Sequence, residues 1–321
     1  MKRVMKAEVF AEKANITDEE WRALRRKGIG GSDAGTICGL NRFSSLLALY
    51  ADKKGLIPDK EDNEAMRLGR DLEEYVALRF KQEMADRGTP KKVKNCNFIL
   101  RHPEHQFMLA NVDRLIVGEN AGLECKTTNV FNQTDFDGGN VPESYYCQCQ
   151  HYMAVTGADR WYLAILQFGK PLFIFTIERN EEDIQNLIAL EKRFWEENVL
   201  AGVAPAADGS ESAGDVLSTM YPGDEEAADV DMTPLEKEVT AIEDLNGQIK
   251  ALEAQKDALA QKVKEYMGNA SCGFTNGFKV FWKPQEQTRL DTKRLKLDHP
   301  EIAAAYSQTS QFRKFYIKEN K

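Results

Sequence analysis

The order of apolar and polar residues divides the first 200 residues into short alternating runs and longer amphipathic runs. A period of two predicts strands, whereas a period near 3.6 predicts helices that bury one face. The predicted strands cover residues 96–101, 107–117, 121–128, 161–168 and 171–178. The predicted helices cover residues 17–26, 32–37, 63–87, 143–156 and 181–200, and a further helix starts after Ser44 or Ser45 and ends before Gly55. This order predicts an α/β core with a mixed central sheet flanked by helices.

The pattern changes after residue 200. Residues 201–231 are rich in Ala, Gly, Asp and Glu, with Tyr221 as their one aromatic residue, which predicts a solvated linker. Apolar residues then follow a heptad spacing from 234 to 267, although Lys256 interrupts one seam, and this spacing predicts a coiled-coil helix. The heptads would either pair with a second copy of the chain or fold back against their own chain.

The last 50 residues are expected to form a small α+β module. Asn276-Gly277 predicts a tight hairpin, followed by a helix near 291–306 and a strand at 311–318. Phe312, Phe315 and Tyr316 on that strand would form core, and the alternative is a basic tail in which they bind DNA or a partner protein. The chain is therefore expected to have three parts. They are a core domain at 1–200, an acidic linker at 201–233, and a coiled-coil helix with its module at 234–321.

Composition indicates a cytoplasmic protein. No apolar run approaches the roughly 18 residues that cross a bilayer, and the basic start of the chain is followed by no apolar segment typical of a secretory signal. The six cysteines match neither a zinc ribbon nor a disulfide framework, so we expect reduced thiols.

The net charge of −8 is unevenly distributed. Residues 194–236 contain eleven acidic side chains and no Lys or Arg, so the rest of the chain carries +3. Residues 272–321 contain ten Lys or Arg and five Asp or Glu. Total charge therefore does not exclude a polyanionic partner such as DNA.

A cluster of charged residues lies at a predicted hairpin. Asp113 ends one β-like run, residues 118–121 form the turn, and Glu124 and Lys126 lie on the next run. Residues two apart on a strand share a face, so Glu124 and Lys126 project together and Asp113 can lie beside them. Two carboxylates and an ammonium are costly to bury, but they suit Mg²⁺ and phosphodiester hydrolysis. The alternative is an ordinary acidic pair at strand ends, because this pattern alone is weak.

Two predicted helices offer further polar residues. At about 100° per residue, Glu73 lies at the edge of the apolar stripe of the 63–87 helix, whereas Glu74 points away. Glu73 can reach an acidic site or simply pair with a nearby base. Gln148 and Tyr152 share a face of the 143–156 helix, where they can orient a phosphate or fill a polar junction.

Arg25 and Ser32 form a candidate phosphate site upstream. A Ser at a helix start beside an Arg suits an anion, while simple capping by Ser32 is the alternative.

Several ordered motifs together resemble the YqaJ family of phage recombination exonucleases, relatives of phage lambda exonuclease in the PD-(D/E)XK superfamily. The resemblance covers roughly residues 15–200. It is carried by Trp21-Arg-Ala-Leu-Arg25, Gly28-Ile-Gly-Gly-Ser-Asp-Ala34, Leu68-Gly-Arg-Asp-Leu-Glu73, Asn111-Val-Asp113, Leu123-Glu-Cys-Lys126 and Tyr146-Cys-Gln-Cys-Gln150. It implies a restriction-endonuclease-like core. Val112 stands where the family often has Pro, a position that supplies no ligand.

The resemblance also implies roles for the metal residues. Asp113 and Glu124 would bind Mg²⁺, or Mn²⁺, with the Cys125 carbonyl as a further ligand. Lys126 would position the attacking water or help to deprotonate it, a role that a lowered lysine pKa would favour. Glu73 would serve a second metal or complete the acidic site.

The other motif residues would bind the substrate. Gln148 and Tyr152 match the Gln-X-X-X-Tyr element beside the active site, and Arg25 and Ser32 match positions that hold a terminal 5′-phosphate.

The implied function is 5′→3′ digestion of one strand of linear double-stranded DNA, which exposes 3′ single strands for phage-type recombination. The implied partners are DNA ends, a single-strand annealing protein and further copies of the chain in a trimer. Two alternatives stay open: a structure- or sequence-specific endonuclease, and a catalytically inactive DNA-binding or scaffold protein.

Overall fold

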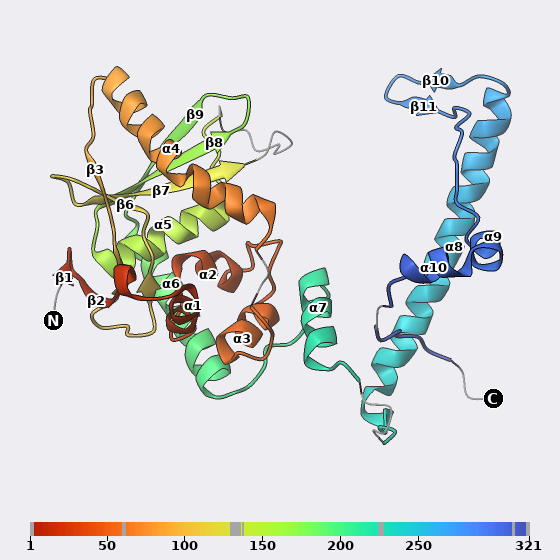
Figure 1. The fold of residues 1–321 in the computed structure, drawn as a ribbon, viewed down its shortest axis with the longest axis horizontal. Coiled ribbons are helices and arrows are strands. Elements are labelled where there is room, and N and C mark those ends of the chain that lie inside the picture. The colour runs from red at the N-terminus through yellow and green to blue at the C-terminus, as the bar shows by residue number, and fades with distance from the viewer. Residues whose placement is uncertain are drawn as a thin grey trace. The chain divides into compact units, whose positions relative to one another are not determined.

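The structure is a computed structural model that describes residues 3–59, 62–128, 136, 138–223, 228–309 and 312–318. The chain forms two compact units, Met1–Tyr221 and Pro222–Lys321 (Figure 1). Each is described below by itself.

A mixed five-stranded sheet forms the centre of the first unit, in the order β3-β6-β7-β8-β9. Its strands are β3 (Val93–Asn95), β6 (Arg114–Ile116), β7 (Ala121–Thr128), β8 (Arg160–Gln167) and β9 (Leu172–Glu178). Strands β7 and β8 are parallel and the other pairs are antiparallel. The parallel pair needs a crossover, which helix α5 (Glu143–Thr156) supplies. The expected mixed α/β core is thus confirmed.

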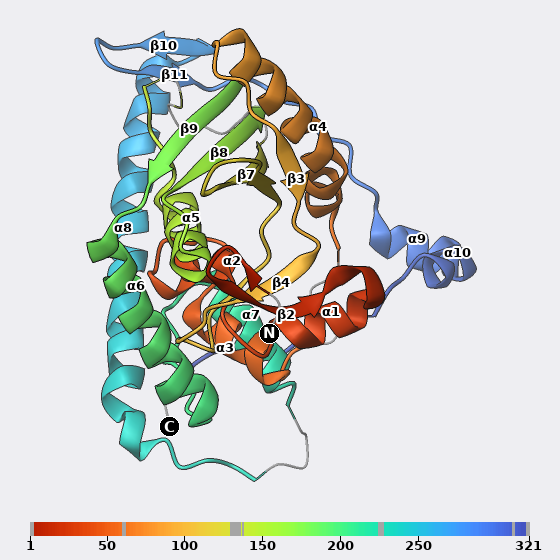
Figure 2. The same cartoon turned by 90° about the vertical axis from the view of Figure 1, so that its left-hand side faces the viewer.

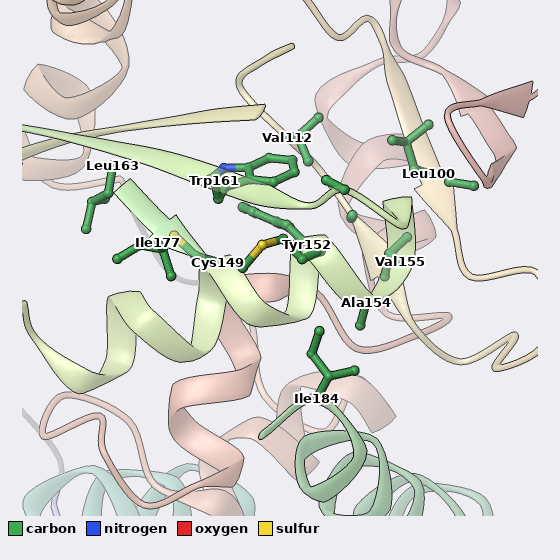
Figure 3. Close-up of a cluster of buried hydrophobic side chains, with 14 of the residues drawn as sticks. Leu100, Val112, Cys149, Tyr152, Ala154, Val155, Trp161, Leu163, Ile177 and Ile184 are labelled. Carbon is green, nitrogen blue, oxygen red and sulfur yellow. The ribbon is translucent and has the colours of Figure 1, made fainter. Parts of the chain in front are cut away.

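Helices cover both faces of this sheet (Figure 1). Helix α4 (Glu64–Asp86) packs Val76 and Phe80 against the face that carries Leu123 and Tyr162. Its first two turns are exposed, although the sequence pattern included them in the apolar stripe. Helix α5 packs on the other face, where the Tyr152 ring lies 5.2 Å from the Trp161 ring (Figure 3).

A second sheet has the order β1-β2-β4-β5. Its strands are β1 (Arg3–Val4), β2 (Ala7–Glu12), β4 (Phe98–Arg101) and β5 (Leu109–Ala110). Strands β1 and β2 were not expected. They are short, and the charged residues around them leave too few alternating apolar positions to indicate a strand.

The continuous strand expected at 107–117 is wrong. Residues 109–110 belong to the second sheet and 114–116 to the central sheet, so 111–113 cross between the sheets. The antiparallel partner strand crosses at the same level, where residues 96–99 stand opposite 111–113. Four residues facing three is an irregularity of the β-bulge type, which bends a ribbon and redirects side chains.

The remaining helices of this unit are α1 (Asp18–Arg25), α2 (Gly31–Ile37), α3 (Leu46–Lys54), α6 (Glu181–Arg193), the π-helical turn η2 (Phe194–Leu200) and α7 (Glu211–Met220). Ser45 caps α3, and Gly55 ends it in a left-handed conformation, as expected. Ser32 is not the cap of α2. The cap residue is Gly30, whose N–H donates to Asp33 Oδ2 at 2.8 Å.

Part of the expected linker is ordered structure. Helix α7 buries Ala213 and Val216 in a cluster that also contains Leu47 and Phe194, and Ser212 Oγ accepts a hydrogen bond from Ser45 N at 3.1 Å. Composition alone misses this helix because a small apolar face of Ala and Val suffices to dock it.

A fully buried ion pair connects α5 to α6. His151 Nδ1 lies 2.8 Å from Glu191 Oε1, and His151 Nε2 lies 2.8 Å from the Leu109 carbonyl. Both ring nitrogens face oxygen acceptors, which favours the protonated imidazolium. Burial lowers the pKa of His151, but the Glu191 carboxylate and both hydrogen bonds outweigh it and raise that pKa above 6.5.

The second unit is built on the long helix α8 (Glu236–Met267), which buries no side chain. After the turn η3 (Thr233–Leu235) and α8 come the hairpin β10 (Cys272–Phe274) and β11 (Lys279–Phe281), then α9 (Thr292–Asp298) and α10 (Pro300–Ala305). The hairpin at Asn276-Gly277 is confirmed.

Two expectations for this module are wrong. The helix near 291–306 is interrupted at His299, because the ring of Pro300 disfavours helical backbone at the residue before it. Residues 312–318 form no strand, and Phe312, Phe315 and Tyr316 are exposed, so they are not core. Residues 310–311 lie outside the described ones. Within the described chain, no helix is long and apolar enough to span a membrane.

Candidate active site

The hairpin of β6 and β7 brings Asp113 beside Glu124. Arg114 pairs with Leu123 and Leu115 with Gly122, so the next pair in register is Asp113 with Glu124. Directly opposed residues of an antiparallel pair share a face. Two residues along β7, Lys126 extends from the same face, and its Nζ lies 2.7 Å from Glu124 Oε1. The expected juxtaposition of these three side chains is confirmed.

Glu124 is the most deeply buried of the three, at 3% exposure. Its Oε1 accepts from Gln148 Nε2 at 2.7 Å as well as from Lys126. Its Oε2 is buried and has no hydrogen-bond partner among the described residues. A buried carboxylate oxygen without a partner is unfavourable unless something else binds it.

Asp113 lies on the segment that crosses between the sheets. Its Oδ2 accepts a hydrogen bond from the Cys125 N–H at 2.8 Å. Burial, followed by the charges of Glu124 and Glu73, raises the pKa of Asp113 well above its usual value of 3.8. The nearby Lys126 lowers that pKa, but too little to offset burial and the two neighbouring carboxylates.

Lys126 remains a cation in this setting. Burial lowers its pKa, but the charges of Glu124 and Asp113 and the hydrogen bond to Glu124 outweigh burial and raise the pKa above 10.5. The lowered pKa was expected for a lysine beside a bound metal and stays a prediction, because the raised pKa belongs to the metal-free arrangement. The ammonium also lies 5.2 Å from the centre of the Tyr145 ring. Tyr145 lies on the same stripe of α5 as Gln148 and Tyr152, a spacing that the sequence already contains.

Gln148 and Tyr152 extend from α5 into this cluster. Gln148 Nε2 donates to Tyr152 Oη at 2.8 Å in addition to Glu124, and Tyr152 Oη donates to the Asn111 carbonyl at 3.1 Å. The two residues thus connect a carboxylate on β7 to the backbone of the crossing segment. These contacts fill the polar junction between α5 and the sheet and also place both residues beside the candidate carboxylate site.

Glu73 does not join the carboxylate pair. Arg114, which sequence reasoning missed, binds it: Arg114 Nη1 lies 2.5 Å from Glu73 Oε1 and 2.9 Å from the Asp113 carbonyl, and Nη2 lies 2.8 Å from Glu74 Oε2. The Glu73 side chain is 33% exposed and that of Glu74 73%, in the expected order. The pairing of Glu73 with a base is the alternative that the geometry shows. The sequence feature that could have indicated this pairing is the basic residue Arg114 directly after Asp113.

Arg25 and Ser32 meet at the start of α2. Arg25 Nη2 donates to Ser32 Oγ at 3.3 Å, and the guanidinium lies 4.6 Å from the Trp21 ring centre. Ser32 is exposed. Beneath them, the Lys53 ammonium binds Asp33 Oδ2 at 2.6 Å and the Arg25 carbonyl at 3.2 Å. This buried ion pair, which the sequence did not reveal, fixes the backbone that presents Arg25 and Ser32.

Backbone contacts connect this loop to the carboxylates. Ile29 N donates to the Phe107 carbonyl at 2.7 Å, and Leu109 N donates to the Ile29 carbonyl at 2.7 Å. The Leu109 strand leads directly into the segment that carries Asp113. All the predicted site residues therefore belong to one connected region, with Glu73 on its α4 side.

The donor set suits a hard cation, although it is incomplete. A bound cation would give the unpartnered Glu124 Oε2 a partner and would favour the ionised form of the buried Asp113. Asn111 Oδ1 is also buried without a partner among the described residues. Carboxylate and carbonyl oxygens are the preferred ligands of Mg²⁺. In the part of the chain that the structure describes, no group of three or more His, Cys, Asp or Glu side chains is arranged to hold a metal. The side chain of Cys125 packs on the α4 side of the sheet. Its backbone carbonyl, and not its thiol, is therefore the candidate metal ligand.

Comparison with known proteins identifies the family. The model of the YqaJ-like viral recombinase domain matches residues 20–159. The Bacillus subtilis (strain 168) protein called "Uncharacterized protein YqaJ" is 40% identical over 318 residues, covering 98% of each chain. This chain belongs to the YqaJ family. Because that alignment extends over both units, the second unit has a counterpart in this YqaJ relative.

Solved structures also resemble this YqaJ-family chain. The alkaline exonuclease LHK-Exo from Laribacter hongkongensis is 22% identical with a TM-score of 0.47, and the match covers 58% of this chain and 94% of that one. A phage-related exonuclease from Haemophilus somnus 129PT is 14% identical with a TM-score of 0.41, over 57% and 99% of the two chains. The family assignment itself depends on the Bacillus subtilis relative and the domain match.

Proposed function

We propose that this YqaJ-family protein is a metal-dependent nuclease that digests one strand of linear double-stranded DNA in the 5′→3′ direction. The observation that carries this proposal is the buried group of Asp113, Glu124 and Lys126, in which a carboxylate oxygen of Glu124 has no partner among the described residues. Two converging carboxylates beside a lysine suit the hydrolysis of a phosphodiester.

Mg²⁺, or Mn²⁺ in its place, is the proposed cofactor. Asp113, Glu124 and the Cys125 carbonyl would hold it, and Glu73 would contribute only after Arg114 releases it. When bound, the cation would supply Lewis-acid polarisation of the phosphate and lower the pKa of a water molecule. The protein's part is to hold the two carboxyl groups side by side, to exclude bulk water and to place the Lys126 ammonium beside the reacting phosphate. In the ammonium form that the metal-free arrangement favours, Lys126 would orient water and stabilise anionic oxygens rather than accept a proton.

Arg25 and Ser32 are the proposed contacts of a terminal 5′-phosphate. Their side chains already bind each other at the start of α2, and Ser32 faces solvent. A guanidinium with a hydroxyl is a strong donor pair for phosphate. Contact with a 5′-phosphate at this place would set both the preference for DNA ends and the direction of digestion.

The proposal extends to the wider setting of the reaction. The first unit would have the PD-(D/E)XK core, α8 would pair as a coiled coil, and the chain would work as a trimer in the bacterial cytoplasm. The 3′ single strands that it exposes would pass to a single-strand annealing protein of a phage-type recombination system.

Two DNA substrates test this function. Purified protein with Mg²⁺ is incubated with linear duplex carrying 5′-phosphates and, separately, with covalently closed circular duplex. The proposal expects release of mononucleotides from the linear DNA and an intact circle. Cutting of the circle indicates instead an endonuclease on the same site, and no cutting of either substrate indicates a DNA-binding or scaffold protein.

Lys126→Ala tests the assignment of the site. We expect at least about a hundredfold loss of digestion, the usual effect of removing a residue that acts on the reacting groups. Lys192→Ala is the matched control, because that lysine is 54% exposed on α6 and only loosely paired with Glu196 at 4.0 Å. Equal digestion by the wild type and Lys126→Ala means that the catalytic assignment is wrong.

A further inference from the structure

The β10–β11 hairpin has one packed face and one open face. Gly273 and Val280 pair directly and are half-buried, and the Cβ position of Gly273 lies 4.0 Å from Met267 Cε at the end of α8. Because faces alternate along a strand, Phe274 and Phe281 project from the opposite face. The hairpin is therefore anchored on one side and presents two aromatic rings on the other.

The open face carries lysines beside the rings. Phe274 is 86% exposed and Phe281 59% exposed. Lys279 pairs directly with Phe274, and Lys283 Nζ lies 5.1 Å from the centre of the Phe281 ring. We call these four residues the aromatic–lysine face. Two exposed phenylalanines on one face of a two-stranded hairpin form an apolar patch that is available to a partner.

The charges indicate the chemistry of that partner. Residues 272–321 contain twice as many basic as acidic side chains, ten against five. A second copy of the same face is disfavoured because it would bring Lys279 and Lys283 against like charges. Phe274 and Phe281 are diagonal neighbours across the hairpin, roughly 7–8 Å apart at the backbone. Flat rings at such a spacing, flanked by cations, are the features on which unpaired bases stack while their phosphates meet lysines.

We propose that the aromatic–lysine face binds single-stranded DNA. The ligand is identified by its two chemistries, exposed base faces and a phosphate backbone. Duplex DNA offers only the second, because its base faces are stacked inside the helix. The inference rests on the proposed function, since digestion of one strand of a duplex leaves the other strand single-stranded.

Binding is tested with the full chain in EDTA, where a metal-dependent nuclease cannot act. Fluorescein-labelled oligo(dT) of about 20 nucleotides, longer than the roughly 4–16 that one module covers, is titrated and followed by anisotropy. The double variant Phe274→Ala with Phe281→Ala should weaken binding at least about fivefold for each ring removed. Tyr306→Ala is the control, because that tyrosine is 86% exposed on a different element and should change nothing.

A second measurement separates stacking from general charge. Lys279→Gln and Lys283→Gln should each reduce the slope of log K against log salt by about 0.7, whereas the phenylalanine variants leave that slope unchanged. A duplex of the same length should show the lysine effect and little of the phenylalanine effect.

Two results overturn the inference: equal affinity of the wild type and the double phenylalanine variant for oligo(dT), and an equal loss of affinity for duplex. If the first comes with a changed sedimentation mass of the variant, the face is an interface between copies. Digestion of linear duplex with Mg²⁺ is assayed separately, so a hairpin without DNA affinity and a protein without nuclease activity give different results.

Discussion

The ring of Tyr152 lies directly against the backbone of Gly31. A Cβ at position 31 would lie 2.5 Å from Cε1 of that ring. Tyr152 is held by hydrogen bonds to Gln148 and the Asn111 carbonyl, so the ring cannot move aside without disturbing the carboxylate cluster. The segment that carries Arg25 and Ser32 and the candidate active site therefore touch at a place where only glycine fits.

Gly31→Ala should destabilise the first unit by roughly 1–3 kcal/mol, the usual effect of an overpacked contact, and should reduce DNA digestion. Urea denaturation measures the first effect. Gly214→Ala is the matched control: its Cβ would meet nothing within 4 Å inside helix α7, so we expect up to about 1 kcal/mol of added stability. Unchanged stability of Gly31→Ala would mean that α2 and α5 can move apart far enough to accept the added methyl group.

Arg114→Lys should cost about 1.5–3 kcal/mol, because an ammonium cannot reproduce the forked contacts with Glu73, Glu74 and the Asp113 carbonyl in a buried setting. Glu74→Gln is the control. The Glu74 side chain is 73% exposed, so its change should stay within about 0.5 kcal/mol. Both are measured by urea denaturation. If both variants lose a similar amount of unfolding free energy, the contact of Arg114 with Glu73 is not the main source of its stabilising effect.

Asp113→Asn should stabilise the protein in EDTA at neutral pH. The pKa of Asp113 is raised in the folded state above its usual value of 3.8, so ionisation of this carboxyl opposes folding as the pH rises from that value through the raised pKa. Asn keeps the acceptor for the Cys125 N–H but carries no charge. Thermal denaturation should therefore show a higher midpoint for the variant in EDTA.

Addition of Mg²⁺ should reverse that order. A cation that binds only the folded wild type raises its midpoint by mass action, and the variant lacks one ligand charge. Asp257→Asn, at an exposed position on α8, should behave as the wild type under both conditions. Equal Mg²⁺ shifts in the wild type and Asp113→Asn would remove Asp113 from the ligand set.

His151→Gln should destabilise the protein by about 3–5 kcal/mol near pH 6, because it leaves the Glu191 carboxylate buried without its cation. The pKa of His151 is raised above 6.5 when folded, so its stabilising effect is complete below pH 6.5 and is lost as the pH rises through the folded pKa. Asp33, which also raises that pKa, stays paired with Lys53.

The difference between wild type and His151→Gln should therefore decrease between pH 6.5 and 9, by up to about 1.4 kcal/mol per pH unit. Urea denaturation at each pH gives this difference. A difference that stays constant over this range would mean that His151 is neutral at pH 6.5.

The central hairpin could be predicted from the sequence because register follows from a short turn and a period of two. Asp113, Glu124 and Lys126 therefore lie together as expected, and helix periodicity correctly ranked Glu73 as less exposed than Glu74. What the sequence did not show was Arg114. Its role depends on α4 packing over that face of the sheet, a tertiary contact that no local period contains.

The other differences also arise from tertiary structure. Alternation continues through 107–117, so nothing local indicates that the strand passes from one sheet to another at 111–113. Likewise, Ala213 and Val216 dock α7 only because a cluster around Leu47 is there to receive them. In the last module, Pro300 was a visible break in the sequence, and the expected helix should have been divided there.

The uneven crossing between the two sheets has a consequence for insertions and deletions. Asp113 occupies the last position before the central sheet, and its direction depends on four residues standing opposite three. Adding or removing one residue there would turn Asp113 to the other face and separate it from Glu124. The turn at residues 118–120, by contrast, lies beyond the paired residues and can change length without moving either carboxylate. Differences in length among relatives that keep this chemistry should therefore accumulate at the turn and be absent from the crossing.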